Sequence, residues 1–313
     1  MKRLDIPINR RIIKSFPDIL FEGFNDIKDV DIFDFYHQIS TKDNLTKEEL
    51  IYIYNIYNRR LLCDMYSKYD YDLNGWKDKI YYMTFLNTGY WFYDVRDPEQ
   101  IEVIKKINEK LDLRKDMATI FDCDIDEVAT TQKELDANPD KYVVLLDSLR
   151  INYKDYCNYP RLKCIIGILL ANSLEESEGL KSLEFIGSNA WLDNLTNLSG
   201  LKNLKAVSGS LSLKSAKSVA SLKSLESVGW DICIPNASLA VGLESLKYIG
   251  GNADFNNLIE ATNLCNLSLI IKKAHLPSLY TVGSFPHLEY VGEGIFINDN
   301  RVKTKIRTKN NER

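Results

Sequence analysis

A 21-residue repeat runs through the second half of this chain, and no other feature constrains its fold as strongly. Five complete units follow one another from Gly179 without insertion or deletion, and a sixth begins at Ser284. When the unit is numbered from 1, positions 2, 5, 8, 12 and 14 are apolar in every unit. One such unit cannot bury its apolar side alone, so the units are predicted to stack as coils around a shared core. Position 5 shows how regular the pattern is, with Leu183, Leu204, Leu225, Leu246, Leu267 and Leu288.

The spacing within the unit predicts the shape of each coil. Positions 12 and 14 lie two apart, which is the period of a strand with one buried face. Positions 2, 5 and 8 lie three apart, which predicts a loose helical or 3₁₀ turn on the opposite wall. A small polar residue at position 16, such as Asn194, is expected to bond to backbone groups left open at the strand end. Parallel strands in one sheet are therefore predicted at 189–193, 210–214, 231–235, 252–256, 273–277 and 294–298.

Two less regular coils are predicted ahead of the clean ones. "SLRIN" (148–152) and "ILLAN" (168–172) both carry the pattern apolar-x-apolar-x-Asn. The full pattern, L-x-x-L-x-x-V-G-x-x-L-x-L-x-N, resembles the short leucine-rich repeats of bacterial and phage proteins over roughly residues 140–300. Its polar residue falls two positions after the second strand leucine rather than three, and its convex side is short. The resemblance implies a solenoid of about eight coils with a parallel strand ladder.

The first part of the chain has a different character. Residues 1–137 hold 21 of the 34 aromatic residues and show no 21-residue period. The spacing of Thr46 and Glu49 is that of a capping box, and a helical apolar face follows as far as Met65. We expect a mainly helical domain that caps the open end of the solenoid, because an end coil otherwise exposes its core.

Other local signals in this part are less uniform. Asp97-Pro98 predicts a second helix start, and a third helix is predicted from about Asp124 to Asp136. The aromatic segment 79–95 fits either a strand or a helix. The predicted fold class is therefore α+β. Its predicted parts are a helical, aromatic-rich domain (1–137), a leucine-rich-repeat solenoid (138–300) and a basic C-terminal tail (301–313).

Composition and charge disfavour several classes of protein. The net charge of −4 does not favour nucleic acid or an anionic membrane as a partner, and no apolar segment is long enough to span a bilayer. The six cysteines lack a CxxC pair, which favours free thiols in a reducing, cytoplasmic compartment. Three scattered histidines disfavour a zinc site, and no phosphate-binding or hydrolase motif occurs, so no cofactor is expected. Richness in Ile, Lys, Asn and Tyr suggests a bacterial or phage genome of low GC content.

Candidate binding residues come from the outward side of the predicted strands. If positions 12 and 14 face the core, positions 11, 13 and 15 face outward. Exposed aromatic side chains are costly unless a partner covers them, and aromatics are favoured at the centres of interfaces. The alternative is that the N-terminal domain covers Trp191 and the C-terminal tail covers Phe296. The predicted partner-binding residues, all at position 13, are Trp191, Cys233, Asp254, His275 and Phe296.

Catalytic and ionic sites receive less support from the sequence. Cys123 lies in "FDCDIDE", which is similar to the Cys-x-Asp motif of bacterial ubiquitin ligases that carry leucine-rich repeats. In this chain the acids follow the cysteine by one and three positions, and the segment precedes the repeats, whereas the catalytic domain of those ligases follows them. The favoured interpretation is therefore a buried cysteine beside an acidic helix start. The acidic segments 29–34 and 69–75 lack EF-hand spacing. The basic tail attracts phosphates in principle, but a disordered, solubilising end is the favoured interpretation.

Two hypotheses of function follow. The leading one is a non-enzymatic, cytoplasmic protein-binding module or scaffold, with the strand face or its edge as the binding surface and membership of a larger assembly left open. The alternative is a bacterial or phage effector or toxin, in which an enzymatic N-terminal domain is directed to its target by the repeats.

Overall fold

The chain forms two compact units in the computed structural model, one from residues 1–54 and 62–112, the other from 55–61 and 113–313. The structure describes residues 37–54, 83–85, 89–91, 102, 106, 109–152, 157–270, 272–279, 285, 287, 288, 290, 291, 294–297, 300 and 301.

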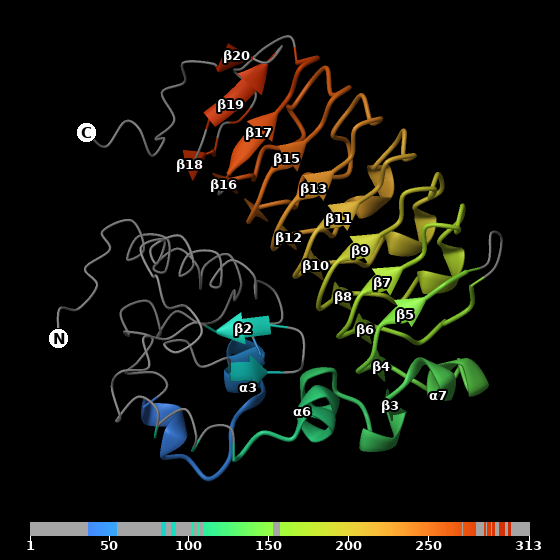
Figure 1. Cartoon of the computed structure of the whole chain (residues 1–313), viewed down its shortest axis with the longest axis vertical. Helices are drawn as coiled ribbons and strands as arrows, with labels where there is room; N and C mark the ends of the chain where they lie inside the picture. The colour runs from blue at the N-terminus through green and yellow to red at the C-terminus, as the bar shows by residue number, and fades with distance from the viewer. Residues whose placement is uncertain are drawn as a thin grey trace, which may run out of the picture. The chain divides into compact units, whose positions relative to one another are not determined.

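Two ladders of short strands build the second unit, in which the coils follow one another along an arc (Figure 1). Ladder A consists of β3 (Val128–Ala129), β4 (Val144–Leu145), β6 (Cys164–Ile165), β8 (Phe185–Ile186), β10 (Ala206–Val207), β12 (Ser227–Val228), β14 (Tyr248–Ile249), β16 (Leu269–Ile270) and β18 (Tyr290–Val291). Ladder B consists of β5 (Leu149–Arg150), β7 (Leu169–Leu170), β9 (Ala190–Trp191), β11 (Leu211–Ser212), β13 (Ile232–Cys233), β15 (Ala253–Asp254), β17 (Lys273–His275), β19 (Gly294–Ile297) and β20 (Asn300–Arg301).

The strand register follows the sequence repeat. In ladder B, Leu211 pairs with Ala190 on one side and with Ile232 on the other, so each step along the ladder is one repeat unit. Neighbouring strands in both ladders are parallel, except that β20 folds back antiparallel on β19. The predicted parallel solenoid is confirmed, and each predicted strand segment contains a short strand. The two irregular coils are also present, as β5 and β7.

The wall opposite ladder B differs from the prediction, because it is ladder A and not a helical turn. Position 8, represented by Val207, was expected in a helical or 3₁₀ turn but lies in a second parallel ladder. The 3₁₀ turns η3 (Glu178–Leu180), η4 (Ser199–Leu201) and η5 (Ala220–Leu222) all end at position 2. Position 6, two residues before position 8, is polar in every unit, so no period of two marks this strand in the sequence. The β-branched residues at position 8 are nevertheless typical of a strand.

One continuous core runs along the solenoid from Ala129 to Ile295. Leu246 at position 5 and Ile249 at position 8 are fully buried, as are their equivalents one coil earlier, Leu225 and Val228. Core residues therefore come from the turn, from ladder A and from ladder B of every coil. Removing their apolar surface from water is the main stabilising contribution to the stack.

Two polar ladders tie neighbouring coils together on the surface. At position 6 the sign of the charge alternates over four successive coils. The ammonium of Lys205 lies 2.7 Å from the carboxylate of Glu184, and that of Lys247 lies 3.2 Å from Glu226. At position 4 a Ser or Asn side chain donates a hydrogen bond to the carbonyl of position 3 in the preceding coil. These donors are Ser182, Asn203, Ser224, Ser245 and Asn266.

The described part of the first unit contains the predicted capping box. The backbone N–H of Thr46 donates to Glu49 Oε2 at 2.9 Å, and that of Glu49 donates to Thr46 Oγ1 at 3.2 Å. Helix α3 (Lys47–Tyr54) follows directly. The predicted continuation to Met65 lies outside the described residues, and most of the helix predicted after Asp97-Pro98 does so too. The segment 79–95 contains an antiparallel pair, β1 (Met83–Phe85) and β2 (Gly89–Trp91).

The prediction of one helix from Asp124 to Asp136 was wrong. The 3₁₀ turn η2 (Ile125–Glu127) leads into β3, and α7 (Gln132–Ala137) starts only after it, while α6 (Leu113–Ile120) precedes both. Val128 and Ala129 are fully buried and pair with Val144 and Leu145 of the next coil. Tertiary pairing with β4 thus overrides a local helical pattern.

Candidate functional site

The predicted position-13 residues form one unbroken row across ladder B. Their backbones are neighbours in the parallel register, and the position-12 residues that precede them are buried. Ser212 is the one buried member of the row, at 2% exposure, while the others are partly exposed. This row, the strand-face row, is Trp191, Ser212, Cys233, Asp254, His275 and Phe296.

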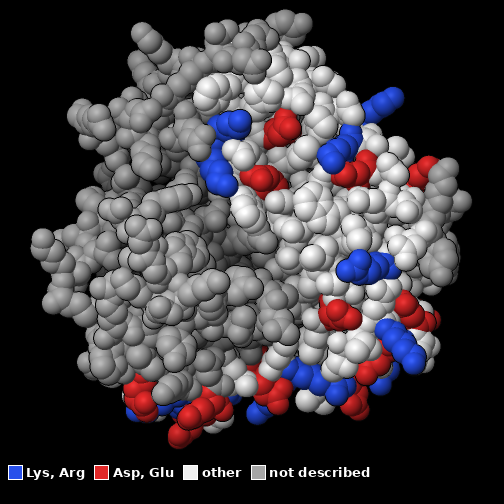
Figure 2. Space-filling model, in the orientation of Figure 1, with Lys and Arg blue, Asp and Glu red and all other residues white. Residues whose placement is uncertain are grey.

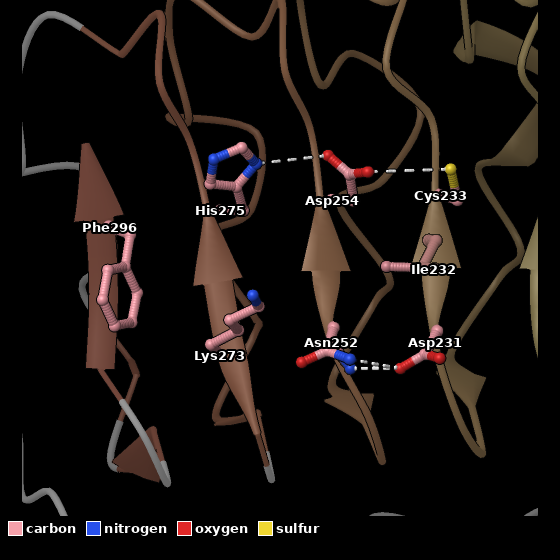
Figure 3. A pocket seen from close by; sticks show the side chains of 8 residues that line it. All are labelled: Asp231, Ile232, Cys233, Asn252, Asp254, Lys273, His275 and Phe296. Atoms are coloured by element: carbon pink, nitrogen blue, oxygen red, sulfur yellow. Dashed lines mark hydrogen bonds and ion pairs between the residues drawn. The ribbon is translucent and has the colours of Figure 1, made fainter. Parts of the chain in front are cut away.

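Four of the five predicted residues of the row also line a hollow on this face. The hollow has a volume of about 370 Å³ and spans four strands, from β13 to β19 (Figure 3). That volume is at the lower end for a small-molecule site. Its walls are Asp231, Ile232, Cys233, Asn252, Asp254, Lys273, His275 and Phe296.

Asp254 stands at the centre of the row within the hollow. The thiol of Cys233 donates to its Oδ2 atom at 3.8 Å, and Nδ1 of His275 lies 3.6 Å from its Oδ1 atom. Figure 3 shows the three side chains side by side, with the carboxylate between the thiol and the imidazole. The chain places them one per coil, each at the same position of its repeat unit, so the stacking itself produces this alignment.

The electrostatics of this trio do not favour a thiolate nucleophile. Burial raises the pKa of the Cys233 thiol, and the negative charge of Asp254 raises it further. A reactive cysteine instead requires a base or a positive charge next to the sulfur. Here the imidazole of His275 is separated from the sulfur by the carboxylate. The arrangement therefore fits recognition by hydrogen bonds and charge better than covalent catalysis.

The second wall of the hollow comes from position 11, which was predicted to face outward but was not named among the binding residues. Asp231, Asn252 and Lys273 stand two residues before the row on the same side of their strands. The backbone N–H and the side-chain amide of Asn252 donate to Asp231 Oδ1 at 2.6 Å and 3.0 Å. The period of two that selected position 13 also selects position 11, so the signal was present in the sequence.

Trp191 lies apart from the hollow, at the other end of the strand-face row. Beside it, Lys214 and Asp193 at position 15 form an ion pair of 2.8 Å, and Ser212 also donates to Asp193. The hydrogen bond from Lys214 to that carboxylate raises the pKa of the lysine. The strand-face row therefore offers an aromatic side chain at one end and a polar hollow closed by Phe296 at the other.

The charge distribution on the described surface is mixed. Figure 2 shows basic and acidic side chains interspersed among larger uncharged areas, and neither sign forms a broad field on the visible face. Binding of a polyanion depends on a concentrated basic surface. The face is thus better suited to a partner that combines apolar, polar and charged groups.

Other candidate chemistry finds little support among the described residues. Burial and the nearby charge of Glu127 raise the pKa of Cys123, as expected for a structural cysteine. Within the described ranges, no group of three or more His, Cys, Asp or Glu side chains is placed to hold a metal ion. Among the helices that the structure describes, none is long and apolar enough to cross a membrane.

The fold and the row define a class of molecule, a parallel-strand solenoid with one repeat unit per turn and few helices. No family model, no curated protein and no solved structure matches the chain.

Proposed function

We propose that this chain is a leucine-rich-repeat protein of the short bacterial or phage type that acts as a non-enzymatic, protein-binding module. Another protein binds along the strand-face row, from Trp191 to Phe296. The part of the chain before β3, the first strand of ladder A, is mainly helical in this proposal. The cysteine pattern supports a reducing, cytoplasmic setting.

The observation that carries this proposal is the continuity of the strand-face row. Six side chains on six successive parallel strands span roughly 24 Å, since neighbouring strands are about 4.8 Å apart. An extended surface of this kind suits a macromolecule better than a small ligand. The hollow gives such a surface a recess in which a partner side chain can be received, with the carboxylates of Asp231 and Asp254 and the ring of Phe296 around it.

Site-specific photo-crosslinking tests the proposal on the full chain. A photoreactive amino acid replaces Phe296 in one version and Lys223, which is exposed and lies outside ladder B, in the matched control. A protein partner in the native host should crosslink through the strand face and not through the control position. The same protein captured equally at both positions, or only at the control position, would contradict binding at this face.

The alternative is an effector or toxin with an enzymatic N-terminal domain. It is distinguished from a binding module by whether the captured protein is chemically modified. A binding module leaves the mass of the purified partner unchanged after incubation. An enzyme alters it even when the chain is present in substoichiometric amount, because each molecule turns over repeatedly. Mass spectrometry of the partner distinguishes the two outcomes.

A further inference from the structure

Each coil has a third side, here named the turn side, which runs from position 17 of one unit to position 5 of the next. Its inward residues are buried, as are Ala237, Ala240, Leu243 and Leu246 on one coil. The residues between them point away from the core. The turn side joins the end of ladder B to the start of ladder A, so it is a surface separate from the strand-face row.

An apolar patch stands out on the turn side. Leu239, Val241 and Ile259 are 43%, 44% and 41% exposed. They are three of the four large hydrophobic side chains that are exposed within the described part of the chain, the other being Ile125. A cluster of exposed aliphatic side chains marks an interaction surface more often than single ones do.

The stacking brings these three side chains together. Leu239 and Val241 flank the buried Ala240, so both emerge on the same side of one strip of chain. Leu239 forms a parallel bridge with Glu260, and the N–H of Ile259 donates to the carbonyl of Ser238 at 3.0 Å. Ile259 therefore lies diagonally beside Leu239 on the next coil, at a spacing of about 5 Å between strips.

Among the described residues of the turn side, large aliphatic side chains are exposed only in this patch. One coil before Leu239 and Val241, the same two positions carry Ser218 and Ala220. Stacking of the coils requires apolar residues only at the inward positions, so the repeat does not explain aliphatic residues at these outward ones.

Opposite charges stand on the two sides of the patch. Lys217 is exposed one coil before Leu239, and Glu260 is exposed one coil after it. Lys217 makes no ion pair with any other residue that the structure describes. Glu260 accepts a hydrogen bond from the hydroxyl of Thr262 at 2.8 Å and keeps its negative charge available at the surface.

We propose that two copies of this chain associate through the turn side around a two-fold axis. An axis that lies in the interface and runs along the strip of Leu239 and Val241 brings each of these residues against its own copy. It also exchanges the preceding coil with the following one. Lys217 of one copy, at position 18, then lies opposite Ile259 at position 18 of the other, and its ammonium reaches the carboxylate of Glu260 at the adjoining position 19. The same pair forms a second time by symmetry. Such self-complementarity is the requirement for an isologous dimer.

The size of the patch sets the strength of the association. It extends over about three coils, on the order of 10–15 Å along the solenoid, which is less than the roughly 800 Å² per partner of a standard interface. The expected dimer is accordingly weak, with a Kd on the order of tens of micromolar. It does not depend on the proposed partner binding at the strand face.

Sedimentation velocity of the full chain over ~5–300 µM, a range that brackets this Kd, tests the proposal. The dimer fraction should rise with concentration, and Leu239→Ser and Val241→Ser should each weaken association at least ~10-fold. Ile125→Ser, which removes an equally exposed side chain elsewhere, should leave it unchanged. Unchanged thermal unfolding shows that the variants keep their fold, because the substituted side chains are on the surface.

Charge reversal gives a sharper test. Lys217→Glu and Glu260→Lys should each disfavour the dimer, because each places like charges opposite one another twice. An equimolar mixture of the two variants should associate again as a heterodimer, and the double variant should associate with itself. A chain that stays monomeric at the highest concentration overturns the proposal, as does a dimer that tolerates both serine variants or shows no rescue on mixing.

Discussion

The side-chain amide of Asn203 donates a hydrogen bond of 2.7 Å to the backbone carbonyl of Lys181, one coil earlier. The same bond recurs along the solenoid with Ser or Asn at position 4, so this position provides the regular polar connection between coils. The sequence pattern predicted that role for position 16. There the amide of Asn236 does reach the carbonyl of Lys214 at 2.6 Å, but Asn257 turns to the side chain of Asn236 instead.

Asn203→Ala should therefore lower the free energy of unfolding by about 1 kcal/mol, the typical net contribution of one such hydrogen bond. Urea denaturation measures the change. Lys202→Ala is the matched control, because its side chain is exposed at the adjacent position, and it should shift the stability by less than ~0.5 kcal/mol. Equal effects of the two substitutions would show that the amide contributes nothing.

Leu246→Ala should destabilise the chain by roughly 2–5 kcal/mol, because the side chain is fully buried between coils and its removal leaves a cavity. Chemical denaturation is again the measurement. The exposed Val241→Ala on the same coil should cost far less. A loss below ~0.5 kcal/mol for Leu246→Ala would place this residue outside the core.

Alkylation of Cys233 tests the electrostatics of the hollow. A raised pKa leaves less thiolate at any given pH, and the thiolate is the reactive form, so Cys233 should react more slowly near neutral pH than a fully exposed cysteine. Asp254→Asn removes one of the charges that raise this pKa, so the pKa should fall and the rate should rise. Asp231→Asn lies in the same hollow and should change the rate little. Peptide mass mapping after timed alkylation at several pH values measures the rates, and no increase in Asp254→Asn would contradict the arrangement.

The two aromatic residues of the strand-face row give a prediction for binding. Trp191→Ala and Phe296→Ala should leave thermal stability nearly unchanged but weaken the affinity for a partner identified by crosslinking, each by at least ~2 kcal/mol if it is an interface hot spot. Titration calorimetry with the purified partner measures the loss. Lys223→Ala serves as the control outside ladder B. Undiminished affinity in both aromatic variants would exclude the row as the binding surface.

The sequence by itself determined the solenoid, its register and the core residues at positions 2, 5, 8, 12 and 14. The reason lies in the repetition, since every 21-residue unit restates the same inward positions and a single register aligns all of them. The strand-face row from Trp191 to Phe296 followed from the same arithmetic, because a strand with a buried position 12 must turn position 13 outward. The capping box of Thr46 and Glu49 was equally readable, since it depends on residues three apart.

Only the tertiary structure decided the features that depend on what a neighbouring coil supplies. Ladder A shows no period of two in the sequence, because position 6 is polar in every unit. Its strands exist because each backbone finds hydrogen-bond partners one coil away. Val128 and Ala129 join it for the same reason, against a local helical pattern. The hollow around Asp254 and the apolar patch at Leu239 arise where side chains from different coils meet, and a repeat pattern specifies that they stack without specifying what they form together.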